Sequence, residues 1–170
     1  MSVRRRTGTG RANGTVKNSE KGSGLQRAMS GLSQSMFNLG ASNHFHAAVI
    51  HKLVFLERKL DIETLREIVR ERFAVNWKFR ATVAEVGNGE LEWRVNGDQE
   101  LDLEWHIKSV NIPTRSGGEF ADQQDINDYV SSFYGKSMDI TRPLWLIHVI
   151  NNARNAGPDG VSNGVIMVRS

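Results

Sequence analysis

The chain has 170 residues and no cysteine, which excludes disulfide bonds, thiolate metal sites and a cysteine nucleophile and suits a reducing compartment. Its formal net charge of +3 arises from 22 basic and 19 acidic side chains. The first 28 residues carry seven of these bases and one acid, so the rest of the chain is mildly acidic and a nucleic-acid-binding domain is disfavoured. No apolar run approaches the roughly 20 residues that a membrane-spanning helix needs.

Residues 1–28 form a segment rich in glycine, serine, threonine, asparagine and arginine, with few apolar side chains. Such a composition cannot bury enough surface to offset the entropy of ordering, so we expect a disordered basic tail. A solvated tail is the simplest interpretation, with a transit peptide or a polybasic contact to anionic lipid as the functional alternatives. Residues 29–170 are then expected to fold as one domain.

The first half of this domain alternates between helices and a strand. We expect one or two helical turns over residues 32–37 and a long strand over residues 44–56. Residues 60–73 predict the clearest helix, with Asp61 as its N-cap. Its apolar stripe consists of Ile62, Leu65, Ile68, Val69 and Phe73.

Strand patterns dominate the next part of the chain. Residues 81–86 and 91–95 alternate around Gly87-Asn88-Gly89-Glu90, which predicts a β-hairpin. A further strand is expected over residues 101–110, where apolar and polar side chains alternate.

The last part of the chain predicts a second helix over residues 122–133, followed by strands over residues 143–150 and 165–170. A loop with a strong turn signal separates these two strands. The order of the elements predicts an α/β (α+β) fold, arranged as a two-layer sandwich.

Few side chains carry a chemical signal. His44 and His46 share one face of a predicted strand, but no third ligand has suitable spacing, so we expect no metal site. His106 and His148 stand alone on predicted strands and are expected to be structural. Asp139 and Arg142 are spaced to form an ion pair at the turn before residue 143. The residues by themselves show no convincing active site.

The segment Asp139-Ile140-Thr141-Arg142-Pro143-Leu144-Trp145 resembles a characteristic segment of the bifunctional wax ester synthase/diacylglycerol acyltransferases. Further segments are similar to that family in order and at compatible spacing: Leu32–Phe37, Leu60–Leu65, Trp77–Arg80 and Leu101–Ile107. The family motif that we transfer consists of Asp139, Arg142, Pro143, Leu144 and Trp145.

This resemblance implies the amino-terminal lobe of a chloramphenicol-acetyltransferase-like fold, with a carboxyl-terminal lobe missing from the chain. It implies transfer of a fatty acyl group from acyl-CoA, as a substrate, to diacylglycerol or a long-chain alcohol, with no cofactor and no metal. The family's catalytic His-His-x-x-x-Asp-Gly motif would follow directly after Ser170, so no catalytic residue is assigned here. We expect a cytoplasmic protein with peripheral contact to endoplasmic reticulum or lipid droplets.

Two other functions stay open. A degenerate lobe would bind a lipid or a partner protein without catalysis, and the residues after Ser170 would then lack the histidine motif. Another condensation-type acyltransferase of the same superfamily would use carrier proteins. By the expected position of the motif, the 170 residues alone should be inactive.

Overall fold

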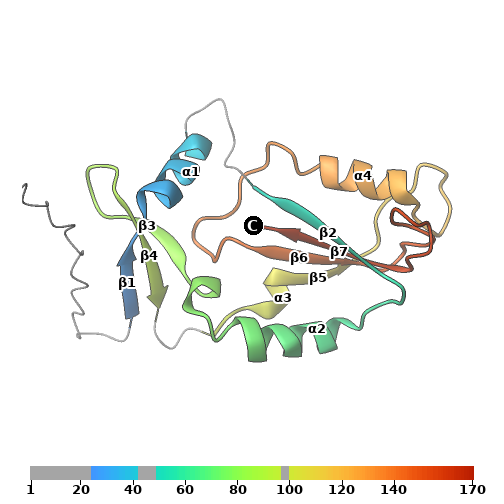
Figure 1. Cartoon of the computed structure of the whole chain (residues 1–170), viewed down its shortest axis with the longest axis horizontal. Helices are drawn as coiled ribbons and strands as arrows, with labels where there is room; N and C mark the ends of the chain where they lie inside the picture. Colours follow the sequence, from blue (N-terminus) through green and yellow to red (C-terminus); the bar gives the residue numbers. More distant parts are fainter. Residues whose placement is uncertain (1–23, 42–48, 97–99) are drawn as a thin grey trace, which may run out of the picture.

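The computed structural model describes residues 24–41, 49–96 and 100–170 (Figure 1). The helices are α1 (Gly31–Ala41), α2 (Ile62–Ile68), a π-helical continuation of α2 (Val69–Phe73), a 3-10 turn (Trp77–Phe79), α3 (Leu103–His106) and α4 (Gln123–Ser131). The strands are β1 (Gly24–Ala28), β2 (His51–Leu56), β3 (Thr82–Glu85), β4 (Leu91–Asn96), β5 (Ile107–Val110), β6 (Leu146–Ile150) and β7 (Gly164–Arg169). The predicted α/β class is confirmed.

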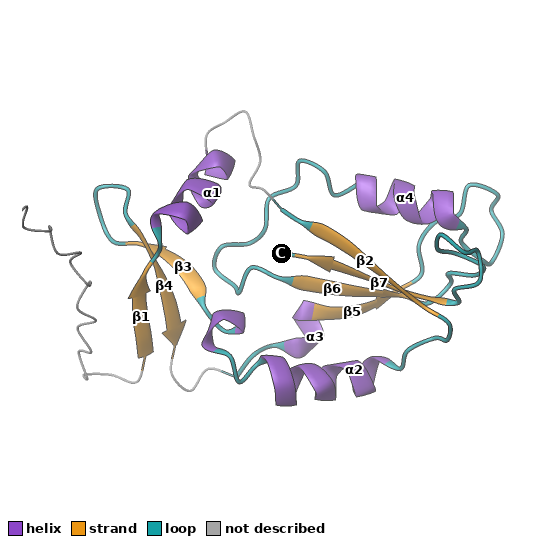
Figure 2. Ribbon diagram, viewed as in Figure 1, coloured by secondary structure: helices purple, strands orange, loops and turns teal. Residues whose placement is uncertain are grey.

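The strands form two separate sheets (Figure 2). The smaller sheet has the order β1-β4-β3 and is antiparallel throughout. The larger sheet has the order β2-β7-β6-β5, in which only the β5–β6 pair is parallel. β7 is therefore an inner strand of the larger sheet, held by backbone hydrogen bonds to β2 on one side and β6 on the other.

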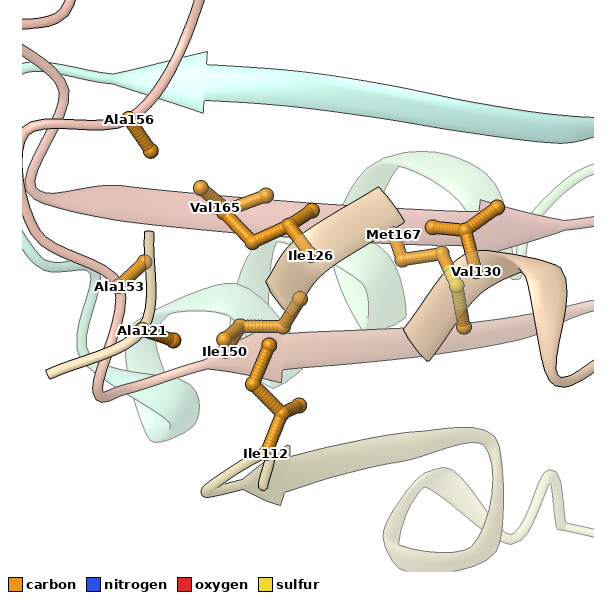
Figure 3. Close-up of a cluster of buried hydrophobic side chains, with 9 residues drawn as sticks. All are labelled: Ile112, Ala121, Ile126, Val130, Ile150, Ala153, Ala156, Val165 and Met167. Carbon is orange, nitrogen blue, oxygen red and sulfur yellow. The ribbon is translucent and has the colours of Figure 1, made fainter. Parts of the chain in front are cut away.

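The main core lies between the larger sheet and α4 (Figure 3). Alternation along β6 and β7 directs one set of side chains toward α4 and the other toward α2 and α3. The buried side chains on the α4 side are Ile112, Ala121, Ile126, Val130, Ile150, Ala153, Ala156, Val165 and Met167. A second cluster, on the opposite face, consists of Val69, Leu103, Ile107 and Trp145.

The predicted N-cap of α2 is confirmed, and α4 has a cap that was not predicted. The Asp61 carboxylate accepts a hydrogen bond from the backbone N–H of Thr64, and this fixes the start of α2. Asp122 and Asp125 form a reciprocal capping box at the start of α4. The predicted hairpin is β3–β4, and its turn places Asn88 at a positive φ of 53°.

Two predictions are wrong because pairing between distant segments outweighs local pattern. Residues 24–28 were assigned to the disordered tail, but they form β1 and pair with β4. Residues 101–110 were assigned to one strand, but α3 occupies Leu103–His106 and only Ile107–Val110 is extended. Asp102 caps this short helix by accepting from the backbone N–H of Trp105.

Helix α2 follows its prediction until the last turn. The structure buries Val69 and partly buries Ile62 and Leu65, as the apolar stripe requires. The prediction is wrong for Ile68 and Phe73, which are exposed. The turn after Ile68 is π-helical, and its wider spacing rotates the later side chains away from the sheet.

The other boundaries differ from the sequence expectation by a few residues. α1 is longer than the predicted turns, and β6 begins at Leu146 because the residues before it form a turn. β2 begins at His51, and positions 44–48 of the predicted strand lie outside the described residues. Within the described residues, no helix has the length and hydropathy needed to cross a membrane.

Candidate functional site

The family motif forms the turn that leads into β6. Asp139 stabilises this turn by accepting hydrogen bonds from the backbone N–H and the hydroxyl of Thr141, at 3.0 and 2.6 Å. These hydrogen bonds lower the pKa of the Asp139 carboxyl. The predicted ion pair is present, with 3.8 Å between Arg142 Nε and Asp139 Oδ2.

The structure adds two partners of Arg142 that the sequence analysis missed. Arg142 Nη1 donates to Asp102 Oδ2 at 3.2 Å, and the guanidinium lies 4.5 Å from the ring centroid of Trp105. The pKa of Asp102 is lowered, first by its hydrogen bond from the Trp105 backbone and then by Arg142. The sequence did contain one signal for a role of Asp102. Aspartate is a residue type that favours helix N-caps, and Asp102 lies in a segment similar to the family.

Trp145 anchors the motif in the second core cluster. Its indole Nε1–H donates to the carbonyl oxygen of Phe79 at 2.8 Å, which connects β6 to the 3-10 turn. The imidazole of His106 stacks on the indole with 4.1 Å between ring centroids, and 2.8 Å separates its Nδ1 from the Trp145 carbonyl oxygen. Burial lowers the pKa of His106, which favours the neutral imidazole; the residue lies on α3 and not on the predicted strand.

A cavity of about 320 Å³ opens beside this junction. Its lining residues are Arg80, Thr82, Glu100, Leu101, Asp102, His106, Thr141, Arg142 and Pro143. Arg80 Nε is buried and has no hydrogen-bond partner among the described residues. The cavity thus combines two guanidinium groups with hydroxyls and carboxylates, an arrangement suited to binding and orienting a polar or anionic group.

The end of β7 is fixed by a buried arginine. Arg169 is only 4% exposed; its Nε donates to His51 Nε2 at 3.1 Å and its Nη2 donates to the Lys136 carbonyl oxygen at 2.9 Å. The guanidinium also lies 4.7 Å from the ring centroid of Phe133. Burial and the Arg169 charge lower the pKa of His51. These contacts tie β7 to β2 and to the turn after α4.

His148 lies under α4, on the same face of the larger sheet as Arg169. The Tyr129 hydroxyl and His148 Nδ1 are 2.8 Å apart, and the Phe133 ring contacts the imidazole edge-on. Burial lowers the pKa of His148 to about 4, with smaller contributions from the charges of Lys108 and Arg169. The imidazole is thus favoured in its neutral form and packs between the Tyr129 hydroxyl and the Phe133 ring.

Metal binding receives no support within the described parts of the chain. Across residues 24–41, 49–96 and 100–170, no group of three histidine, aspartate or glutamate side chains is arranged to hold an ion. His44 and His46, the strand pair that the sequence analysis weighed, lie outside the described residues.

Comparison with protein families identifies the fold and the motif together. The family model for the wax ester synthase/diacylglycerol acyltransferase catalytic domain matches residues 29–156. The chain belongs to this family. The match contains every family-like segment quoted above, including the motif from Asp139 to Trp145, so the resemblance seen in the sequence is confirmed.

Individual relatives of the family are distant. A candidate diacylglycerol O-acyltransferase of Mycobacterium tuberculosis is 26% identical over 83 residues, which are 49% of this chain and 15% of that protein. A protein of Mycobacterium bovis with the same description matches equally. The chain therefore spans a small part of the length of the curated relatives that it matches.

Solved structures show the same fold. The wax ester synthase/diacylglycerol acyltransferase of Marinobacter aquaeolei VT8 superposes with a TM-score of 0.57 at 18% identity, covering 84% of this chain and 33% of the other. The starter condensation domain of rhizomide synthetase gives 0.59 at 13% identity, covering 85% and 32%. The tallysomycin biosynthesis protein TlmII gives 0.60 at 14% identity, covering 86% and 32%. These similarities confirm the acyltransferase-type fold expected from the motif.

Proposed function

We propose that this chain is the amino-terminal lobe of an enzyme that transfers a fatty acyl group from acyl-CoA to diacylglycerol or a long-chain alcohol. The observation that carries the proposal is the ordered family match over residues 29–156, three of whose segments, Trp77–Arg80, Leu101–Ile107 and the motif, meet around Arg142 and Trp145. A shared junction of this kind supports a preserved family fold more strongly than any single short motif does.

The proposed reaction needs no cofactor, since the acyl group arrives activated as a thioester. The hydroxyl oxygen of the acceptor forms the new ester bond to the acyl carbon, the carbon–sulfur bond breaks, and CoA leaves as the thiol. A histidine takes the acceptor proton and passes it to the leaving thiolate. By resemblance, that histidine belongs to the motif expected after Ser170. We assign no catalytic role to the described histidines, because their imidazoles are engaged in packing and hydrogen bonds.

Within this proposal, the described residues hold β7 and the cavity beside Arg142 in place. β7 is an inner strand, and Arg169 fixes its end to β2 and to the turn after α4. Such anchoring would support a catalytic site on the residues that follow β7, because catalytic groups must be held in a fixed geometry. We also propose a cytoplasmic location with peripheral contact to lipid, where the acceptors are dissolved.

The test is an assay of the whole protein with radiolabelled palmitoyl-CoA and either dioleoylglycerol or hexadecanol. We expect labelled triacylglycerol, wax ester or both, separated by thin-layer chromatography. Residues 1–170 alone serve as the matched control and should form neither product. The proposal fails if the whole protein releases no CoA with either acceptor, and the proposed inactivity of residues 1–170 fails if they alone show turnover.

A condensation-type reaction is the second candidate, because condensation domains superpose as well as the acyltransferase does. In that reaction an amine on a carrier-bound or soluble thioester would replace the lipid hydroxyl as acceptor. Adding an aminoacyl thioester of N-acetylcysteamine to the same assay separates the two. Amide formation without ester formation would establish the second candidate.

A further inference from the structure

The connection between α2 and β3 exposes apolar side chains in the same segment as basic ones. Val75 is 71% exposed and Phe73 is 46% exposed, although both sit next to the second core cluster in the sequence. Arg70, Arg72 and Lys78 are exposed in the same segment. Residues 70–78 are called the α2–β3 connection below.

Backbone hydrogen bonds fix the conformation of the segment that exposes these side chains. The π-helical turn ends with a hydrogen bond from Ala74 N to the Val69 carbonyl oxygen, and Asn76 N then bonds to the Phe73 carbonyl oxygen at 2.9 Å. The Phe73 ring rests edge-on against Phe79 with 5.5 Å between centroids. The exposed side chains of Phe73 and Val75 are therefore carried by an ordered turn.

The charged side chains of this connection are predominantly positive. The guanidinium of Arg27 and the ammonium of Lys78 lie 5.5 and 5.9 Å from the ring centroid of Trp77. The connection itself contains three basic side chains and a single acid, Glu71. Among the ion pairs of the described residues, none involves these bases, so their charges are available to a partner.

We propose that the α2–β3 connection docks on the surface of an anionic phospholipid membrane. Val75 and Phe73 enter the boundary between headgroups and acyl chains, Trp77 lies at the headgroup level, and the basic side chains contact lipid phosphates. Charge complementarity favours this occupant, because a segment with exposed apolar side chains, three exposed bases and one acid matches a surface that is apolar below and negative above. The inference rests on the proposed function, whose acceptors are dissolved in lipid.

The test compares two variants of the whole chain, each with the same substitution. Val75→Asp places an acid at the proposed insertion point, whereas Val161→Asp places one at a comparably exposed valine, 55% accessible, in the loop before β7. Binding is measured by sedimentation with vesicles of equal parts phosphatidylcholine and phosphatidylglycerol. We expect Val75→Asp to lower the vesicle partition coefficient by at least about tenfold and Val161→Asp to leave it within about twofold of the parent chain.

The basic tail is present in both variants, so its attraction to lipid cannot produce the difference. Equal binding by the two variants would overturn the proposal and would indicate that the connection meets a protein surface instead. As a second measurement, brominated phospholipid should quench part of the tryptophan fluorescence of the parent chain, and Trp77→Phe should remove that part. Quenching that is unchanged by Trp77→Phe would also contradict the proposal. Neither measurement depends on catalysis, so the membrane-binding result can be interpreted even if the acyltransferase assay fails.

Discussion

Acid should destabilise this fold through His148. Its imidazole is 7% exposed beneath α4 and its pKa is lowered to about 4 in the folded state, against 6.5 for an unburied histidine. Between these two values the unfolded chain binds a proton that the folded chain does not, so the free energy of unfolding falls as pH falls. The difference of 2.5 pKa units corresponds to about 3 kcal/mol in full, of which about 2 kcal/mol is lost between pH 7 and pH 5.

The perturbation that isolates this effect is His148→Gln, which keeps an acceptor for Tyr129 but cannot be protonated. Urea unfolding of the parent and the variant is followed by tryptophan fluorescence at pH 7 and pH 5, and acidic groups common to both proteins cancel in the comparison. His51 and His106 also have lowered pKa values and contribute to both proteins, so the difference between parent and variant reports His148. We expect the variant to lose about 2 kcal/mol less than the parent on acidification. The same loss in both proteins would refute the reasoning.

Three substitutions test other parts of the structure by urea unfolding at pH 7. Trp145→Ala should lower the free energy of unfolding by about 3–5 kcal/mol because it empties the second core cluster, and a loss below about 1 kcal/mol would contradict that packing. Tyr129→Phe should cost about 1–2 kcal/mol by leaving the buried His148 Nδ1 without its hydrogen-bond partner, whereas the exposed Tyr134→Phe should stay within about 0.5 kcal/mol; equal effects would argue against the bond. Gly164→Ala should cost about 1–3 kcal/mol, since its Cβ would approach a backbone carbonyl oxygen to 2.5 Å, while Gly31→Ala meets nothing within 4 Å and should be near neutral.

The elements that could be predicted are those fixed by neighbouring residues. The cap at Asp61 and the hairpin turn at Asn88 depend on contacts within a few positions, so sequence spacing was sufficient. The apolar runs that became β6 and β7 were equally readable, because strands covered on both faces are apolar throughout.

Short elements whose stability comes from distant partners were not predictable. Residues 101–106 alternate as a strand would, yet α3 forms because His106 gains a stacking partner in Trp145, 39 positions away. β1 has no apolar pattern of its own and exists through its pairing with β4. Periodicity over four or five residues cannot distinguish a helical turn from a strand, so tertiary contacts decide such cases.

The ordered segments ending in the motif from Asp139 to Trp145 were enough to recognise the family from the sequence. The side chains that surround this motif and the end of β7 could be identified only in the folded chain. Arg142 gains Asp102 from 40 positions away, and Arg169 gains His51 from 118 positions away. Motifs are local in the chain and can be recognised by spacing, whereas the partners of a buried or clustered charge are selected by how the strands pair, which is a property of the whole fold.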